Sequence, residues 1–440
     1  MAATEKLLKG SGVLYTDRRD FYVSPQVVKE LWTDVAPFTT VISNRESRKV
    51  PDPIFKMFEH RNPWVKQLFL CDSDTDNLDS DNVTNTTVTV DGASNCSIDD
   101  SLVGHICEVW TTGYGSKKGI VRVDSVTSGT VVVVNTLWTS TGNDIALADN
   151  DIFLIIGNAQ GEGTSSPEAW ADELEVVWNS TQIFKTPLQI TGTLLAASLR
   201  GESSELARLR AQKNQEHKMQ KEKAFLFGKR VGGTGLDLQD GSTSDSFADG
   251  GVLDSDGNLV RTTYGAVSAI ETYGDSTSTN DYQNIFTVSE ASYSYSSFVD
   301  DMEKVFQYVP EAGVKRAFVG AGALGYWSKI AGTSGMAGNS GWTVNMSDMK
   351  RDSLGFNYKI LETPHGILQL IPAPALRGPY NKYMLVVSEE NLFHAQYRSP
   401  MYQTNIKTDN AFDGVKDQYM SDEGVGIQLI ESHHLFKITD

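Results

Sequence analysis

The chain has 440 residues and a formal net charge of −18, with 56 acidic residues against 38 lysines and arginines. This length leaves room for two or three domains with cores of their own. The acidic balance argues against a nucleic-acid reader that works through bulk positive charge. The three cysteines are too few, and odd in number, for a disulfide framework, and they show no zinc-ligand spacing with the seven histidines.

Neither a secretion signal nor a membrane span is visible in the sequence. The first twenty residues contain no apolar core of the kind that a signal peptide needs. No apolar run reaches the length of about 18 residues that a spanning helix requires. We therefore expect a soluble protein, made in a reducing cytoplasm and without membrane contact.

The first 45 residues are expected to be extended or loosely structured, apart from a short helix over 24–35. Ser24 is the predicted N-cap of that helix, and Pro25 occupies its first position. Strand-like segments follow at 55–60 and 64–70. The acidic segment that starts at Asp72 has almost no apolar residue and is predicted to be a loop.

Between residues 84 and 156 the sequence changes to short β segments separated by turn residues. Five such segments recur at a spacing typical of a small barrel or sandwich: TTVTVDG, HICEVWTT, KGIVRVDSV, TVVVVNTLW and DIFLIIG. Because this block supplies its own apolar residues, we predict that it folds as a unit.

Residues 178–230 are predicted to form two β segments followed by one long helix. Pro187 places its strand at a sheet edge or at a break. Residues 202–228 lack an internal glycine or proline and consist mainly of helix formers, with Gly228 at the position of a C-cap. At about 1.5 Å per residue, this helix is about 40 Å long.

The middle of that helix has almost nothing apolar to bury between residues 210 and 218. A helix this polar lies on a surface, bridges other elements, or is supported by neighbouring chains. Two interpretations stay open: an ordinary solvated helix of one domain, or a helix whose partners come from other subunits.

The remaining sequence alternates helices and strands. Residues 232–258 form a Gly- and Asp-rich loop containing the hairpin signal VLDSDGNLV. Helices are predicted over 296–309 and 323–331, with a strand at 316–319, and the last eighty residues are mainly strands. The fold class is therefore α+β with one inserted β domain.

Motifs for catalysis or ligand binding are weak throughout. Gly320, Gly322 and Gly325 match a dinucleotide-binding G-x-G-x-x-G formally, but no βαβ unit surrounds them. The D-x-D-x-D run from Asp72 lacks the glycine and the final glutamate of a calcium loop. Adjacent carboxylate pairs elsewhere in the chain do not face each other as a glycosidase requires. We expect no enzyme activity, no cofactor and no metal site.

Four stretches, taken in order, resemble the major capsid proteins of tailed bacteriophages, which have the Hong Kong-97-type fold. Residues 36–60 resemble an N-terminal arm leading into an extended E-loop, and the β block closing over 151–170 resembles an insertion that some of these proteins carry. Residues 179–230 resemble the returning E-loop strand and the spine helix, including Glu222, Phe225 and Gly228 near its end. Residues 354–366 and 383–400 are similar to closing strands of the axial and peripheral domains.

The resemblance implies a division of the chain into arm, E-loop, insertion, peripheral and axial parts. The implied boundaries are 1–50 for the N-terminal arm, 51–83 and 160–198 for the E-loop region, 84–159 for the β-barrel-like insertion domain, 199–285 for the peripheral domain with the spine helix and the Gly/Asp-rich loop, 286–385 for the axial domain, and 386–440 for the closing strands of the peripheral domain.

The implied function is that of the major capsid protein of a tailed double-stranded-DNA bacteriophage. Copies would assemble into hexamers and pentamers of an icosahedral shell around the genome, in the cytoplasm of the host bacterium. The implied partners are neighbouring capsomers, portal, scaffold or decoration proteins, and packaged DNA at the inner face without sequence specificity.

Subunit contacts are expected from aromatic anchors on the E-loop and from the basic middle of the spine helix. An isolated two-stranded loop cannot bury its own apolar residues, so these must lie on a neighbour. The helix cations would meet an acidic surface of an adjacent subunit or face DNA. The candidate contact residues are Phe55, Phe58, Trp64, Arg208, Arg210, Lys213, Lys218 and Lys221.

Two alternatives from other classes remain. The β block alone would suit a β-rich virion decoration protein or adhesin, although such a protein has little use for a long polar helix. A hydrolase with an unrecognised carboxylate site would be a compact monomer with a pocket.

Overall fold

The computed structural model describes most of the chain, and all structural statements below concern these residues. They are 36–60, 68–72, 77–80, 85–91, 96, 98–164, 174–197, 204–230, 252–276, 283–308, 313–332, 345–346, 350–351, 357–406 and 413–439. The expected helix over 24–35 lies outside them. No helix among them is both long enough and apolar enough to cross a membrane.

The largest unit is an eight-stranded mixed sheet with the strand order β13-β22-β19-β14-β18-β17-β15, to which β16 adds at β17. The strands are β13 (Ile285–Ser289), β14 (Val314–Val319), β15 (Asn345–Met346), β16 (Lys350–Arg351), β17 (Asn357–Glu362), β18 (Ile367–Pro372), β19 (Tyr383–Val387) and β22 (His434–Thr439). The C-terminal strand β22 therefore joins the part of the chain expected as axial, and not the peripheral strands to which residues 386–440 were assigned.

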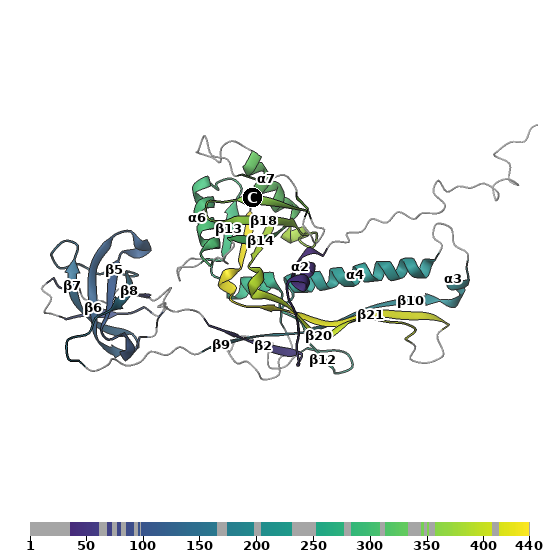
Figure 1. Cartoon of the computed structure of the whole chain (residues 1–440), viewed down its shortest axis with the longest axis horizontal. Coiled ribbons are helices and arrows are strands. Elements are labelled where there is room, and N and C mark those ends of the chain that lie inside the picture. The colour runs from purple at the N-terminus through teal and green to yellow at the C-terminus, as the bar shows by residue number, and fades with distance from the viewer. Residues whose placement is uncertain are drawn as a thin grey trace, which may run out of the picture.

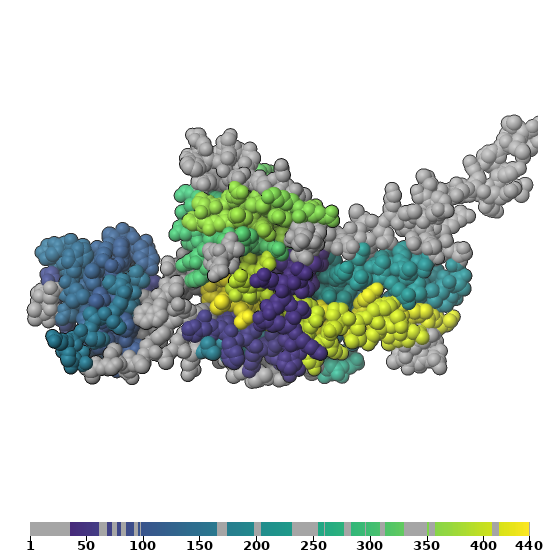
Figure 2. Space-filling view, viewed as in Figure 1, coloured from purple at the N-terminus to yellow at the C-terminus, as the bar shows by residue number. Residues whose placement is uncertain are grey.

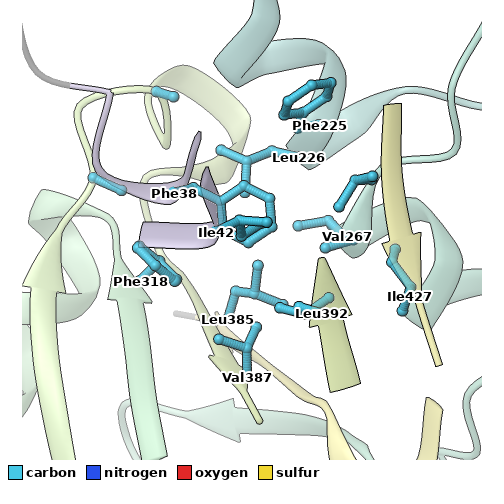
Figure 3. Close-up of a cluster of buried hydrophobic side chains, with 14 of the residues drawn as sticks. Phe38, Ile42, Phe225, Leu226, Val267, Phe318, Leu385, Val387, Leu392 and Ile427 are labelled. Carbon is cyan, nitrogen blue, oxygen red and sulfur yellow. The ribbon is translucent and has the colours of Figure 1, made fainter. Parts of the chain in front are cut away.

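Both faces of this sheet are covered, because alternate side chains of a strand point to opposite faces. Ala317 and Val319 of β14 pack under the helices α6 (Tyr295–Phe306) and α7 (Ala321–Gly332). Phe318, between them, packs on the other side with the helices α2 (Pro37–Arg45) and α5 (Ala266–Tyr273). Figure 3 shows this second cluster, in which Phe38 of α2 lies near Leu226.

The second unit is a four-stranded sheet covered by the long helix. Its order is β1 (Ser47–Lys49), β20 (Leu392–Gln403), β21 (Gly414–Ile427) and β10 (Gln182–Thr191). The helix α4 (Glu205–Phe227) lies along β10 and β21 and ends at Gly228 (Figure 1). A Cβ at Gly228 would lie 2.4 Å from the Thr263 carbonyl oxygen, so this turn requires glycine. Pro187 is on the edge strand β10, as its residue type predicts.

A two-stranded ribbon, β2 (Ile54–Glu59) and β9 (Glu175–Ser180), runs from this sheet toward a separate six-stranded unit (Figure 1). The six strands have the order β3-β8-β5-β6-β7-β4. They are β3 (Leu68–Leu70), β4 (Asn85–Thr89), β5 (His105–Trp110), β6 (Lys117–Ser128), β7 (Val131–Thr139) and β8 (Ile152–Asn158).

The six-stranded sheet curls until its two edge strands meet. The Asp91 amide donates to the Leu70 carbonyl at 2.9 Å, and the Asp72 amide donates to the Thr89 carbonyl at 2.8 Å. Its buried cluster includes Phe69 and Phe153, whose rings stack at 4.9 Å, and all members come from within this unit. We call residues 68–158 the barrel module. It begins before the expected boundary at residue 84, because β3 is one of its strands.

Short elements complete the chain. They are α3 (Gly192–Ala196), η2 (Asp100–Leu102), η3 (Thr112–Tyr114), the hairpin β11 (Val252–Leu253) and β12 (Leu259–Val260), η4 (Gly378–Tyr380), η5 (Glu389–Asn391) and η6 (Ile430–Ser432).

We predict that the barrel module can be removed without unfolding the rest of the chain. Its first and last strands pair, with Leu68 opposite Leu154, so a short Gly/Ser linker can join the flanking residues. Deleting 68–158 should leave a chain that unfolds cooperatively by circular dichroism. Deleting only 84–156 should cause aggregation, because β3 with Phe69 loses its partners. An unfolded product from the 68–158 deletion would contradict the modular interpretation.

Candidate subunit-contact surfaces and the seat of the long helix

The ribbon has one buried and one exposed face. Its strands are antiparallel, with Phe55 opposite Asn179 and Phe58 opposite Val176. Phe55 is only 6% exposed and packs against Phe393 of β20, with ring centroids 6.0 Å apart. Phe58, on the opposite face, is 68% exposed. The ribbon is thus seated on its own subunit and presents the other face outward.

The three aromatic residues expected as anchors differ in their positions. Phe55 belongs to a core cluster of its own chain with Met57 and Val50, so the contact with a neighbour expected for it is not supported by its position. Of the two that the structure describes, Phe58 has the exposure that an anchor needs and Phe55 does not. Trp64 lies outside the described residues.

The base of the ribbon is fixed by buried polar contacts. The Asn179 side chain donates to the Val425 carbonyl at 2.6 Å and accepts from the Tyr264 amide at 2.9 Å. The Arg230 guanidinium lies 3.6 Å from the centroid of the Trp178 ring and donates to the Trp178 carbonyl. These contacts link β9 to β21 and to the segment before α5, so the ribbon leaves the subunit in a defined direction.

The polar middle of α4 is held by charged and polar partners from its own sheet. Arg210 pairs with Asp417 at 2.8 Å, and Lys221 pairs with Glu423 at 3.1 Å. His217 lies between them, and residues 210, 217 and 221 share one face of a helix with 3.6 residues per turn. Since both carboxylates are fully buried, this helix face is part of the subunit interior.

Asp417 is the most densely satisfied of these carboxylates. Burial alone would raise its pKa, but donors from Tyr402, the Asn405 amide and Arg210 lower the pKa below its ordinary value. Charge-assisted hydrogen bonds of this kind are about twice as strong as neutral ones. The carboxylate therefore remains ionised and holds the helix to β21.

The three other expected contact cations of the helix divide into two groups. Arg208 pairs with Glu205, and Lys213 pairs with Glu216, both within the helix. Lys218 is exposed. Four of the five expected contact cations therefore have carboxylate partners in their own chain, and we do not assign these four a contact with DNA or with a neighbouring subunit.

His217 is a buried neutral group. Its Nδ1 lies 3.0 Å from the Thr186 hydroxyl, and its Nε2 lies 3.1 Å from the Ser421 hydroxyl. Burial lowers the pKa of His217 to about 4, and the charge of Lys221 acts in the same direction. The neutral imidazole thus bridges β10 and β21 beneath the helix.

Glu222, which follows Lys221 in the helix, fixes α2 to α4. Its buried carboxylate accepts from the Phe38 amide at 2.9 Å, the Thr39 amide at 2.7 Å and the Thr39 hydroxyl at 2.6 Å. Amides at a helix N-terminus lack partners within the helix, and the positive end of the helix dipole favours an anion there. Burial raises the pKa of Glu222, although these donors partly offset that effect.

Sequence reasoning missed α2 and the carboxylates that receive α4. One signal for the carboxylates was present. The residues Asp417, Tyr419, Ser421 and Glu423 alternate along β21, which places one polar row on a single face of the strand. The two carboxylates of this row carry the negative charge that complements a helix with a basic middle.

The glycine motif that starts at Gly320 allows close packing at the start of α7. The Asn381 side chain accepts from the Gly322 amide at 3.0 Å, and a Cβ at Gly320 would lie 2.2 Å from the Asn381 carbonyl oxygen. The start of α7 is thus filled by its own chain. Asp74 and Asp76 of the acidic run lie outside the described residues. Within the part that the structure describes, no group of three or more potential metal ligands occurs.

Comparison with known proteins gives the family. A model of the family described as SU10 major capsid protein matches residues 32–433. The chain belongs to the SU10 major capsid protein family. No curated protein matches the sequence. The expected identity as a tailed-phage major capsid protein is confirmed, and the protein is a structural, shell-forming component of the virion.

Solved structures similar to this SU10-family chain include capsids with little sequence identity. The capsid of a native GTA particle has a TM-score of 0.43 and 8% identity, covering 99% of this chain and 100% of that one. The structure described as Microbacterium phage Oxtober96 has a TM-score of 0.43 and 9% identity, covering 98% and 99%. That described as Mycobacterium phage Patience has a TM-score of 0.37 and 13% identity, covering 64% and 78%.

We predict that acid destabilises the unassembled subunit partly through His217. Its pKa is about 4 in the folded chain, against an ordinary value of 6.5, so the unfolded chain binds more protons between these values. The stabilisation of the folded subunit by neutral His217 is fully present above pH 6.5 and is lost as the pH falls toward 4. The Tm of His217→Gln should lie below that of the wild type at pH 7.5, and the gap should narrow by pH 4.5. A constant gap would contradict this assignment.

We also predict that Glu222→Ala destabilises the subunit by about 3 kcal/mol, because it leaves buried amides of α2 without an acceptor. The matched control Glu216→Ala, on the exposed side of the same helix, should cost no more than about 0.5 kcal/mol. Urea unfolding of both variants gives the comparison. Equal losses would show that Glu222 has no special role in holding α2.

Proposed function

We propose that this SU10-family protein forms hexamers and pentamers of an icosahedral shell that encloses double-stranded DNA. The observation that carries the proposal is the ribbon β2–β9. It is firmly seated on its own subunit, yet it projects beyond the sheet and exposes Phe58 on its outer face. An exposed aromatic residue on a rigid support is typical of an interface anchor.

The proposed partners follow from shell assembly. Copies in the same and in neighbouring capsomers contact the ribbon, while portal, scaffold or decoration proteins contact the completed shell or its precursor. DNA is confined by the shell without sequence-specific recognition. Assembly takes place in the cytoplasm of the host bacterium, and the subunit acts through its contacts, with no catalytic step.

A decoration protein or adhesin is the weaker candidate. Such a role would rest on the barrel module alone. The family match extends over residues 32–433 and includes the ribbon, the long helix, the four-stranded sheet and all of the eight-stranded sheet except β22. No observation favours a hydrolase.

We predict that Phe58→Ala prevents or strongly reduces shell assembly while leaving the subunit folded. Truncating a central interface aromatic residue costs about 2 kcal/mol or more per contact, and every subunit in the shell carries the change. Electron microscopy and sedimentation would measure particles, and circular dichroism would measure folding. Normal particle yield from Phe58→Ala would remove the ribbon contact from the proposal.

Two controls distinguish interface from subunit effects. Lys56→Ala changes the same exposed face without removing an apolar group and should leave assembly nearly intact. Phe55→Ala opens the subunit core and should lower subunit stability by about 3 kcal/mol. Phe58→Ala should reduce assembly, unlike Lys56→Ala, and should leave subunit stability unchanged, unlike Phe55→Ala.

A further inference from the structure

The negative charge of the chain is concentrated in the barrel module. Residues 68–158 contain 13 acidic residues and three basic ones, a net charge of −10 out of −18 for the whole chain. All three bases pair with carboxylates of the module itself: Lys117 with Glu108, Lys118 with Asp151, and Arg122 with Asp124. Ten of the acidic residues belong to the described part of the module, so this part presents a net negative surface to its surroundings.

A positive surface lies on the four-stranded sheet, on the side away from α4. Because Asp417 points toward the helix, its neighbour Lys416 points to the opposite side, as does Lys185 on β10. Neither lysine pairs with a carboxylate in the part of the chain that the structure describes. Arg261 and Arg398 lie on the same side. We call Lys185, Arg261, Arg398 and Lys416 the basic sheet face.

One carboxylate accompanies these four cations. Asp422 lies 3.2 Å from the Arg398 guanidinium and 3.9 Å from that of Arg261, and it is only 1% exposed. It orients the two arginines but contributes little to the accessible surface. The basic sheet face therefore keeps a net charge of +3 in a chain that is acidic overall.

The two charged surfaces lie apart in one subunit. Figures 1 and 2 show the barrel module at one end of the long axis, and the ribbon β2–β9 lies between it and the four-stranded sheet that contains β10 and β21. Two complementary surfaces that lie apart on one molecule can form a head-to-tail contact between copies. Such heterologous contacts close into rings where the rotation between copies permits it.

We propose that the barrel module of one copy docks, through its carboxylates, on the basic sheet face of a neighbouring copy. The inference rests on the proposed shell function and adds the partner surfaces. Exposed ion pairs contribute little individually, but complementary fields select the partner and its orientation. The contact should weaken as salt shortens the Debye length, which is about 8 Å at physiological ionic strength.

Carbodiimide cross-linking of assembled shells tests the contact directly, because this reagent joins a lysine amine to a carboxylate that touches it. Shells built from mixed light and nitrogen-15-labelled subunits would identify links between copies by mass spectrometry. We expect links from Lys185 or Lys416 to carboxylates within 72–151. Links from these lysines only to other regions, or to none, would overturn the proposal.

Charge reversal gives the second arm of the experiment. The double variant Lys185→Glu/Lys416→Glu should lower particle yield about tenfold at low salt, because like charges then face each other. The control Lys223→Glu/Lys350→Glu changes the net charge equally at exposed positions on α4 and β16, away from this face, and should assemble normally. Equal yields from both variants would overturn the contact while leaving the shell function intact.

The same variants and shells distinguish the docking contact from the proposed shell function and from nucleic-acid binding by the basic sheet face. Normal shells that lack the predicted links would reject the contact alone, and a wild-type chain that forms no shell under any condition would reject the proposed function. If the double variant assembles normally but its shells retain less DNA, the basic sheet face binds nucleic acid, and the docking proposal fails.

Discussion

The polar seam between α4 and β21 is the constraint on which the rest of the subunit depends. Arg210, His217 and Lys221 lie against Asp417, Ser421 and Glu423, all three of which are fully buried, while Arg210 keeps a side-chain exposure of 37%. Breaking one member of such a pair leaves an uncompensated buried charge, which costs several kcal/mol. The helix therefore has one position on the sheet, whereas an apolar seam would tolerate small shifts.

This fixed position determines where the assembly surfaces lie. The far end of α4 carries Glu222, which places α2, and Gly228, which turns the chain toward the segment that supports the ribbon base. The ribbon direction is thus set by the same helix that rests on β21. A rigid connection of this kind suits a subunit that meets copies of itself at defined angles.

Much of the fold was accessible from the sequence, for identifiable reasons. The long helix, its glycine end, the edge strand with Pro187 and the β-rich insertion all have local signals in residue type and spacing. The helix α2 was missed because its N-terminus is satisfied by Glu222, a residue 183 positions away from Thr39. The partners of the helix cations were missed for the same reason. The polar row on β21 is visible as an alternation in the sequence, but its contact with α4 joins Arg210 to Asp417, 207 positions away, and no local pattern identifies that pairing. The burial of Phe55 likewise depends on Phe393 of a distant strand.

The edges of the four-stranded sheet determine how copies of this protein cannot associate. One edge is β10, in which Pro187 lacks the amide that an incoming strand would need, and the other is β1, only three residues long with Arg48 and Lys49 exposed. Strand addition from another copy is disfavoured at both edges. Many copies can therefore crowd together without growing into an open-ended cross-β fibre. Their association depends instead on side-chain surfaces, whose contacts can be reversed, corrected and closed.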